Sequence, residues 1–339
     1  MVIPLAVLST IFESGVVLGG TWTSVSSPTL KDLYDVYAAS PTDAWAVGQG
    51  GIILRWDGSD WKSISSPTSE NLHGVYMLSA TDGWAVGRGG AILRWNGIGW
   101  ENFPSPTTEA LREIDFSSPN DGWVVGYNGT ILKWDGTSWE NSPSPVAENF
   151  HDVQALSSTD AWAVGSHGRI IRWDGENWSL VTSPTSESLS GISMSSPNEG
   201  WATGARVFLK WDGASWSLAS TSSEPVFFYS ICMSSTTGGW VVGEDYSTGR
   251  GTIYYWDGSS WAKSSSARMI LGAVHLASPE DGWAVGADGT ILQLVPFGSV
   301  PSALFNVLII DTLVFIFVAI MFWRAWKGSS RASVGSSQR

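Results

Sequence analysis

The chain of 339 residues contains a single cysteine, Cys232, so no disulfide can form within it. It also lacks the strings that mark common catalytic centres, since no HExxH, paired CxxC, P-loop or GxSxG motif occurs. Basic residues are scarce, with 18 Lys and Arg against 31 Asp and Glu. A chain so acidic would repel the phosphates of nucleic acid. We therefore expect no nucleic-acid partner, no cofactor, no metal site and no catalytic residues.

Tryptophan and glycine are abundant instead, with 22 and 38 residues, and they recur at a fixed spacing. A Trp-x-x-Gly string begins at seven positions: Trp45, Trp84, Trp123, Trp162, Trp201, Trp240 and Trp283. The first five steps between these tryptophans are 39 residues each, and the last is 43. A period near 40 with four short apolar runs in each unit predicts a β-propeller.

Four strand-like runs make up the first unit, at residues 33–39, 44–48, 52–56 and 61–65. The first three runs occur seven times along the chain, but the fourth follows a third run only six times. The missing copy lies at the N-terminus, where Gly20 to Pro28 matches Trp61 to Pro67 closely. We predict an all-β, seven-bladed propeller of four-stranded blades over residues 20–296, closed by an N-terminal strand in the last blade.

The two ends of the chain differ from the repeats. Residues 1–19 are mostly apolar and are interpreted as a possible signal peptide or its remnant. After a short linker at 297–302, Ala303 to Trp326 is long and apolar enough for a transmembrane helix. The tail at 327–339 is basic, which predicts a cytoplasmic C-terminus and an extracytoplasmic propeller in a single-pass cell-membrane protein. If residues 1–19 are no signal, a tail-anchored protein with a cytosolic propeller is the alternative.

The repeats carry a family resemblance. The pattern SPxDGWxVGxxGxIL, at Ser118 to Leu132 and Ser278 to Leu292, resembles the photosystem II stability and assembly factor family and the wider group of BNR or Asp-box propellers. The resemblance implies a propeller over the whole ring. Asp57 to Trp61 is one residue shorter than an Asp-box, and Arg55 replaces its leading Ser or Thr. These degenerate boxes lend little support to sialidase-type chemistry, and members of such families serve unrelated functions on one scaffold.

Positions that repeat in every unit are interpreted as scaffold. The tryptophans at the positions of Trp45, Trp56 and Trp61 in each unit, here called columns, are expected to fill the contacts between neighbouring blades. The Trp61 column lies on the outermost strand, and a set of aromatic sugar platforms is its alternative reading. An acidic column that starts at Asp43 and a basic column that starts at Arg55 are expected to form ion pairs at the rim.

Positions that differ between units are the candidate binding face, because recognition residues sit on loops of a rigid scaffold. At the entries to the first strands the candidates are Tyr34, His73, Arg112, His151 and Tyr229. In the hairpins between second and third strands, treated as one column, they are Arg88, Tyr127, His167, Arg206, Arg250 and Asp288. The longest hairpin, Glu244 to Arg250, is expected to overhang the channel mouth.

These patterns favour a non-catalytic, membrane-anchored propeller that binds a protein or assembly partner through its polar loop face. A glycan-binding, lectin-like module or a glycoside-processing enzyme is the alternative. An enzyme would need two nearby carboxylates, for which Glu113 and Asp152 on adjacent blades are the candidates. A third hypothesis is a structural cell-surface protein whose ring only spaces or shields.

Overall fold

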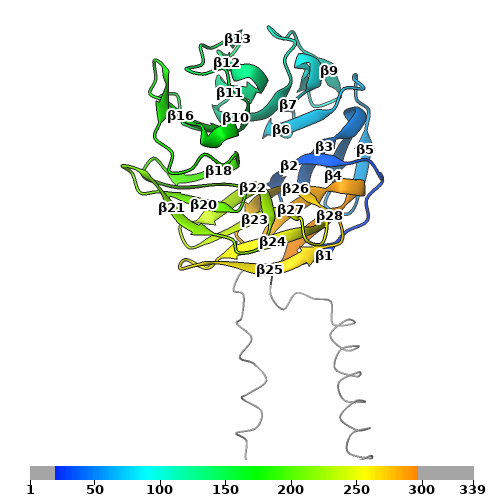
Figure 1. Cartoon of the computed structure of the whole chain (residues 1–339). Helices are drawn as coiled ribbons and strands as arrows, with labels where there is room; N and C mark the ends of the chain where they lie inside the picture. The colour runs from blue at the N-terminus through cyan, green and yellow to red at the C-terminus, as the bar shows by residue number, and fades with distance from the viewer. Residues whose placement is uncertain (1–19, 297–339) are drawn as a thin grey trace, which may run out of the picture. The chain divides into compact units, whose positions relative to one another are not determined.

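The computed structural model describes residues 20–296, which form seven four-stranded antiparallel sheets around a central axis (Figure 1). The predicted seven-bladed propeller is confirmed. The predicted signal segment at 1–19, the linker at 297–302, the transmembrane span at 303–326 and the tail at 327–339 lie outside the described residues. Within residues 20–296, no helix combines the length and the apolar character that a membrane crossing requires.

The first blade shows the order that the other blades follow. Its strands run from the channel outward as β2 (Leu33–Ser40), β3 (Asp43–Gly48), β4 (Ile53–Trp56) and β5 (Trp61–Ile64). A single 3-10 turn, η2 (Gln49–Gly51), joins β3 to β4. Pro41, Gly50 and Gly58 lie in the turns that separate these strands.

The next three blades repeat this order with closely similar strand lengths. The second blade contains β6 (Leu72–Ser79), β7 (Asp82–Gly87), η3 (Arg88–Gly90), β8 (Ile92–Trp95) and β9 (Trp100–Asn102). The third contains β10 (Leu111–Ser118), β11 (Asp121–Gly126), η4 (Tyr127–Gly129), β12 (Ile131–Trp134) and β13 (Trp139–Asn141). The fourth contains β14 (Phe150–Ser157), β15 (Asp160–Gly165), η5 (Ser166–Gly168), β16 (Ile170–Trp173) and β17 (Trp178–Val181).

The last three blades are less uniform, and the sixth has the longest strands. The fifth contains β18 (Leu189–Ser196), β19 (Glu199–Gly204), β20 (Val207–Trp211) and β21 (Trp216–Thr221). The sixth contains β22 (Val226–Ser235), β23 (Gly238–Asp245), β24 (Arg250–Trp256) and β25 (Trp261–Ala267). The seventh contains β26 (Leu271–Ser278), β27 (Asp281–Gly286), η6 (Ala287–Gly289), β28 (Ile291–Val295) and the N-terminal β1 (Thr21–Ser24).

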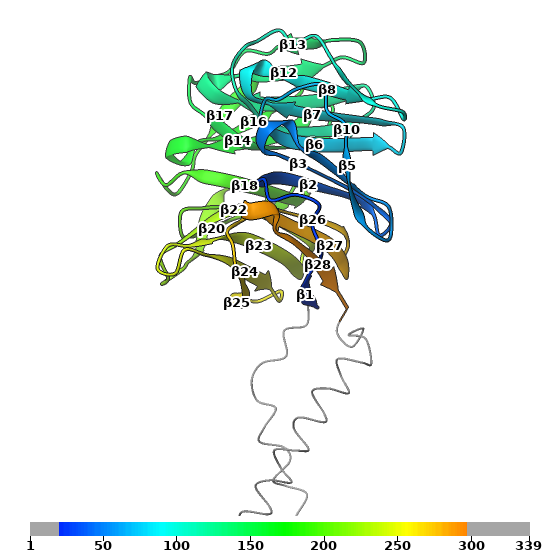
Figure 2. The same ribbon diagram turned by 90° about the vertical axis from the view of Figure 1, so that its right-hand side faces the viewer.

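The ring closes through the two ends of the repeat region. Strand β1 pairs antiparallel with β28, with Trp22 opposite Leu294. Figure 2 shows the dark blue β1 beside β28 at the end of the coloured chain. The predicted closure is therefore confirmed, and the backbone edge of β28 is covered by β1 rather than left free to pair with another chain.

Tryptophans fill the boundaries between blades. Trp84, on a second strand, is fully buried, and its ring lies 4.8 Å from that of Trp134 and 5.6 Å from that of Trp139, both in the next blade. The same arrangement places Trp95 and Trp100 on Trp45. This confirms the scaffold interpretation. Five fourth-strand tryptophans are at most 5% exposed, so the sugar-platform reading is wrong for them: Trp61, Trp100, Trp139, Trp178 and Trp216.

The repeated charges form ion pairs inside single blades, as predicted. Arg55 Nε lies 2.9 Å from Asp43 Oδ1, and the guanidinium carbon lies 4.9 Å from the ring centroid of Trp45. Equivalent pairs join Asp82 to Arg94, Asp121 to Lys133, Asp160 to Arg172 and Glu199 to Lys210. These pairs neutralise the basic column, and their cations lie over the rings of buried tryptophans, so they leave little charge available for a ligand.

The mouth of the central channel as a candidate binding site

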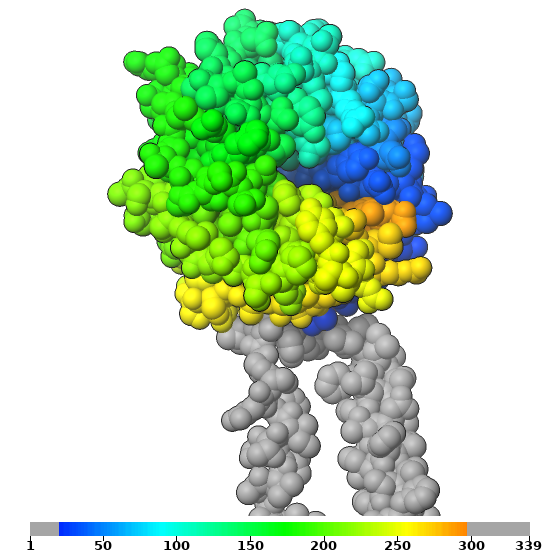
Figure 3. Space-filling view, viewed as in Figure 1, coloured from blue at the N-terminus to red at the C-terminus, as the bar shows by residue number. Residues whose placement is uncertain are grey.

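A cavity of 650 Å³ occupies the channel at the end where the inner strands begin. Residues of all seven inner strands line it: β2, β6, β10, β14, β18, β22 and β26. In the space-filling view a hollow lies near the centre of the ring, between the green and blue blades (Figure 3). A cavity of this size lies in the range of sites for small molecules or for a few side chains of a partner.

A β-bulge lies near the start of each inner strand, and in β2, β10, β14 and β22 it aims two successive side chains at this cavity. In β2, Leu33 pairs with Gly48 and Asp35 pairs with Val47, so Tyr34 is the extra residue. A regular strand would turn successive side chains to opposite faces, whereas a bulge re-aims them. Both Tyr34 and Asp35 therefore line the cavity.

The bulge falls at the same place in every blade. The extra residues in the other six inner strands are His73, Arg112, His151, Ser190, Tyr229 and Gly272. The recurring glycine of the Trp-x-x-Gly string explains part of this geometry. A Cβ atom on Gly48 would lie 2.0 Å from the carbonyl oxygen of Asp32, so only glycine permits the close approach of β3 to the start of β2.

One side of the mouth is basic and aromatic. The rings of Tyr34 and His73 are 5.1 Å apart, and Arg112 Nη1 lies 3.4 Å from His73 Nδ1. The guanidinium carbon of Arg112 lies 5.9 Å from the ring centroid of Tyr127, and Arg88 lines the same wall. We call Tyr34, His73, Arg88, Arg112 and Tyr127 the basic arc. It brings together residues of three blades that are about one repeat apart in sequence.

The charge of the basic arc belongs to its two arginines. Burial, with the nearby charges of Arg112 and Arg88, lowers the pKa of His73 to about 3, so its imidazole is neutral at neutral pH. Within residues 20–296, neither Arg88 nor Arg112 lies within ion-pair distance of a carboxylate. The Nε atom of Arg112 is buried without an acceptor in the same part of the chain. Two guanidiniums are thus available to an anionic group.

The opposite side of the mouth is aromatic and belongs to the sixth blade. The Tyr229 hydroxyl donates to Glu244 Oε2 at 3.1 Å, and the Tyr229 ring lies 4.9 Å from that of Phe227. Tyr246 follows in the long hairpin and is 57% exposed. We call Phe227, Tyr229 and Tyr246 the aromatic arc. Glu244 attaches the hairpin to Tyr229 at the mouth, and residues 244–250 do not line the cavity itself.

Ion pairs and hydrogen bonds hold this long hairpin in place. The buried carboxylate of Asp245 accepts the backbone N–H of Ser247 at 2.9 Å. Lys263, on the outermost strand β25, lies 2.6 Å from Glu224 and 3.3 Å from Asp245. These contacts join three segments of the sixth blade, so the aromatic arc stands on a well-braced support.

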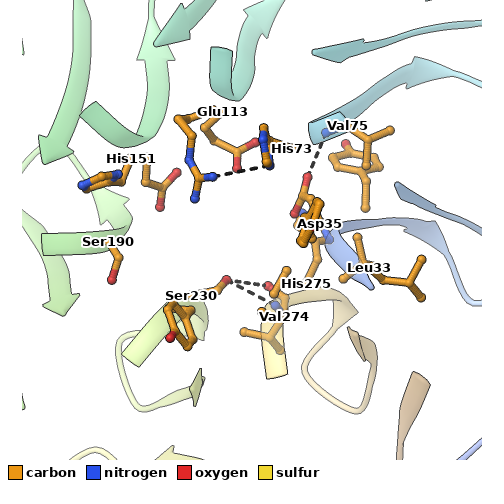
Figure 4. Close-up of a pocket in the computed structure, with 18 of the residues that line it drawn as sticks. Leu33, Asp35, His73, Val75, Glu113, His151, Ser190, Ser230, Val274 and His275 are labelled. Atoms are coloured by element: carbon orange, nitrogen blue, oxygen red, sulfur yellow. Dashed lines mark hydrogen bonds between the residues drawn. The ribbon is translucent and has the colours of Figure 1, made fainter. Parts of the chain in front are cut away.

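Below the mouth, side chains fasten each inner strand to the next blade. Asp35 Oδ2 accepts the backbone N–H of Val75 at 2.8 Å, as Figure 4 shows. Asp115 accepts the N–H of Ala155 at 2.7 Å, and Asp152 accepts that of Ile192 at 2.7 Å. Four further contacts complete the circle: Tyr76 to Phe116, Ser193 to Met233, Ser230 to Val274 and His275 to Ala38. All seven blade boundaries therefore carry at least one such fastening, and Gln154 adds a second one, to Met194, beside that of Asp152.

Four carboxyl groups gather around this part of the channel: Asp35, Glu113, Asp115 and Asp152. Burial raises the pKa of Asp35, Asp115 and Asp152 to about 7. Burial and then the charges of Asp35 and Asp152 raise the pKa of Glu113 well above its ordinary value. Within the described part of the chain, no group of three or more His, Cys, Asp or Glu has the arrangement of a metal site.

The structure brings together some of the sequence candidates and separates others. Six candidates line the cavity: Tyr34, His73, Arg88, Arg112, His151 and Tyr229. Tyr127 touches Arg112 at its edge. The remaining candidates do not line it: His167, Arg206, Arg250 and Asp288.

The hairpin candidates do not form one column. Arg88 and Tyr127 are the first residues of the turns η3 and η4. His167 and Asp288 are the second residues of η5 and η6, with left-handed φ values of 56° and 53°. His167 contacts Glu148 at 3.0 Å instead of the cavity. Sequence spacing alone did not separate these two positions, because both follow the same glycine and both vary between repeats.

The fastening residues are what the sequence analysis missed. Asp152 was considered as a possible catalytic carboxylate, and none of these residues was predicted to link blades. The sequence does contain a pattern that could have identified these contacts. The acceptor and the donor are 40 residues apart, which is one repeat of 39 residues plus one residue, as in Asp35 with Val75 and Asp152 with Ile192.

No protein-family model matches this chain, and no curated protein matches it. Solved structures do. A structure described as YCF48 bound to D1 peptide superposes with a TM-score of 0.67 at 18% identity, covering 83% of this chain and 99% of that one. YCF48 from Cyanidioschyzon merolae gives 0.66 at 17%, covering 81% and 99%.

A third structure broadens the comparison beyond YCF48. The WD40 β-propeller domain of Doa1 superposes with a TM-score of 0.71 at 12% identity, covering 83% of this chain and 98% of that domain. At such identities the likeness concerns the fold alone. The chain therefore has a β-propeller fold like that of YCF48, as the resemblance in its repeats implied.

Proposed function

We propose that this protein is a non-catalytic scaffold that binds a segment of a protein partner at the mouth of its channel. The observation that carries the proposal is convergence. Six positions that differ between repeats line a single cavity. The repeated tryptophans and ion pairs instead form packing contacts and charge pairs within and between blades. Variable side chains on a rigid, repeated support are typical of a recognition surface.

The chemistry of the mouth describes the partner segment. Arg88 and Arg112 have no carboxylate partner within residues 20–296, and a guanidinium forms its strongest hydrogen bonds with carboxylates. The aromatic arc on the other side offers flat apolar surface with hydroxyl groups. A segment with an acidic residue at one end and an apolar or aromatic residue at the other fits both arcs. One YCF48 structure is described as bound to a peptide, and this supports a peptide ligand here.

The same scaffold is proposed to be anchored in a membrane and displayed outside the cell. The support is the apolar segment from Ala303 to Trp326, followed by Lys327 and Arg331, which favour the cytoplasmic side. Residues 1–19 would direct the ring across the membrane. Protease treatment of intact cells checks this topology, and a protected ring would contradict it.

The glycan and enzyme alternatives have weaker support. Five of the outer tryptophans considered as sugar platforms are buried. Glu113 and Asp152 do line one cavity, but Glu113 accepts the N–H of Ile114, and Asp152 accepts those of Val153 and Ile192. Those bonds account for the two carboxyl groups as backbone acceptors, so a scaffold is the simpler function.

The test is capture of a partner by the full chain from native membranes. Tyr34→Ala, Arg112→Ala and Tyr229→Ala together are expected to abolish crosslinking to the partner while the thermal midpoint changes little. Arg250→Ala is the charge-matched control, since this exposed arginine lies outside the cavity. Equal capture by the triple variant and the wild type would refute binding at the mouth. Retention on a glycan array would instead favour the lectin alternative.

A further inference from the structure

The four carboxyl groups in the channel form one electrostatic unit. Glu113 lies close enough to Asp35, Asp152 and Asp115 for each of their charges to act on it. Asp152 acts in turn on Asp35 and Asp115. Figure 4 shows Asp35 and Glu113 on neighbouring sides of the cavity, with His275 across from Glu113. If all four were ionised, four negative charges would share one half-buried space.

Within residues 20–296, no Lys or Arg lies within ion-pair distance of these four carboxyl groups. Besides the four carboxyl groups, the charged or titratable residues that line the cavity are one further aspartate, two arginines, three histidines, four tyrosines and one cysteine: Asp32, Arg88, Arg112, His73, His151, His275, Tyr34, Tyr37, Tyr76, Tyr229 and Cys232. The arginines belong to the mouth, and Arg112 contacts His73 rather than a carboxyl group. Burial lowers the pKa of His151 and His275 to about 4, so these imidazoles are neutral near pH 7. Residues on β18 add no titratable side chain to the lining.

Three of the four carboxyl groups are also structural fastenings. Asp35 joins β2 to β6, Asp115 joins β10 to β14, and Asp152 joins β14 to β18. The other four boundaries depend on hydroxyl or imidazole groups. Ionisation of the carboxyl groups therefore acts directly on the contacts at three blade boundaries. The other four boundaries contain no carboxyl fastening and are affected only indirectly.

We propose that protonation of the carboxyl groups in the channel controls how firmly neighbouring blades are held together, an arrangement that we call the lock. With protons bound to Asp35, Glu113, Asp115 and Asp152 the inner strands are held together, and release of those protons on passing from neutral to mildly alkaline solution loosens the boundaries that the carboxyl groups span. The lock is coupled to the mouth by chain position, because Tyr34, Arg112 and His151 each directly precede one of these carboxyl residues. It does not depend on which ligand the mouth binds.

The sign follows from proton binding. Folding raises the pKa of Asp35, Asp115 and Asp152, so the folded chain holds protons that the unfolded chain has released, and their contribution to stability is lost as the pH rises through about 7. The three histidines act in the opposite direction, but only below about pH 6.5. Burial raises the pKa of Cys232 to about 11, which affects stability only above about pH 8.5. Between about pH 6.5 and about pH 8 the carboxyl groups therefore dominate the change in stability.

Hydrogen exchange of the full chain in detergent tests the lock. We expect the protection of the amides of Val75, Ala155 and Ile192, corrected for intrinsic rates, to fall about fourfold between about pH 6.5 and about pH 8, the factor for one carboxyl with a pKa near 7. The amides of Met233, Val274 and Ala38 are the internal controls, because uncharged groups hold them. An equal fall in both sets, or no fall in the first, would overturn the proposal.

A pair of matched variants gives a second measurement. Asp115→Asn keeps an oxygen for the N–H of Ala155 but cannot titrate, so the pH effect at Ala155 and the infrared band of one protonated carboxyl group should both disappear. Asp135→Asn is the control, since this exposed aspartate holds a hairpin in which Asn96 serves the same role in the second blade. If Asp115→Asn leaves the band and the pH effect unchanged, the lock is refuted. The contrast between amides within the wild type stands even if that variant folds poorly.

Discussion

Asp152 Oδ2 lies 2.7 Å from the backbone nitrogen of Ile192, which is 40 residues later in the chain and in the next blade. The other oxygen of the same carboxyl group accepts the N–H of Val153 at 2.8 Å. One side chain thus satisfies two backbone donors on two inner strands that form no backbone ladder with each other.

Replacing this group is expected to destabilise the ring according to the number of acceptors lost. Asp152→Ala leaves two backbone N–H groups without their partner, at a cost of about 1–3 kcal/mol for each group that stays dry. Asp152→Asn keeps one carbonyl oxygen and should cost less. Urea unfolding of both variants at neutral pH measures the difference. Equal stability of the two variants would show that the hydrogen bonds to Val153 and Ile192 contribute little.

The tryptophan wedges predict a large cost for truncation at a blade boundary. Trp84 is fully buried between the second and third blades, where it also meets Phe103 at 4.9 Å. Trp84→Ala is expected to lower the free energy of unfolding by about 3–5 kcal/mol because the cavity cannot close. Leu218→Ala, at a side chain that is 49% exposed, is the control and should change stability by less than about 0.5 kcal/mol.

Ring closure by β1 predicts a change in association state when that strand is removed. A chain that begins at Ser27 lacks β1, so the backbone edge of β28 is uncovered. Trp240 also loses its contact with the ring of Trp22, whose centroid lies 5.4 Å away in the intact ring. We expect a lower thermal midpoint and oligomers by light scattering, since a free strand edge pairs with other chains. A chain that begins at Gly20 is the control and should behave as the intact ring. A stable monomer without β1 would contradict this role.

The histidines of the mouth are predicted to stay neutral over the physiological range. Burial lowers the pKa of His73 to about 3 and that of His151 to about 4. Their imidazole resonances should therefore not titrate between about pH 5 and about pH 8, and the stability that they contribute should be lost only as the solution becomes more acidic than about pH 6.5. Arg112→Gln should raise the pKa of both imidazoles, because it removes a nearby positive charge. A midpoint near pH 6.5 for either histidine would contradict the geometry described.

The sequence by itself determined the blade number, the closure and the scaffold role of the tryptophans. These features repeat, and a repeat of 39 residues must place equivalent side chains in equivalent contacts. The count of fourth strands required a strand from the N-terminus. Strand β1 is that strand, with Trp22 opposite Leu294 of β28. The rim pairs followed for the same reason, since Asp43 and Arg55 recur together.

Only the tertiary structure decided which variable residues form the site. Spacing placed Arg88 and His167 in one class, but a single residue of difference within a tight turn sends the first to the cavity and the second to Glu148. The bulge that turns both Tyr34 and Asp35 inward arises from the backbone pairing of two strands, not from a local pattern. The fastening of Asp152 to Ile192 joins separate blades, and such contacts exist only once the ring has closed.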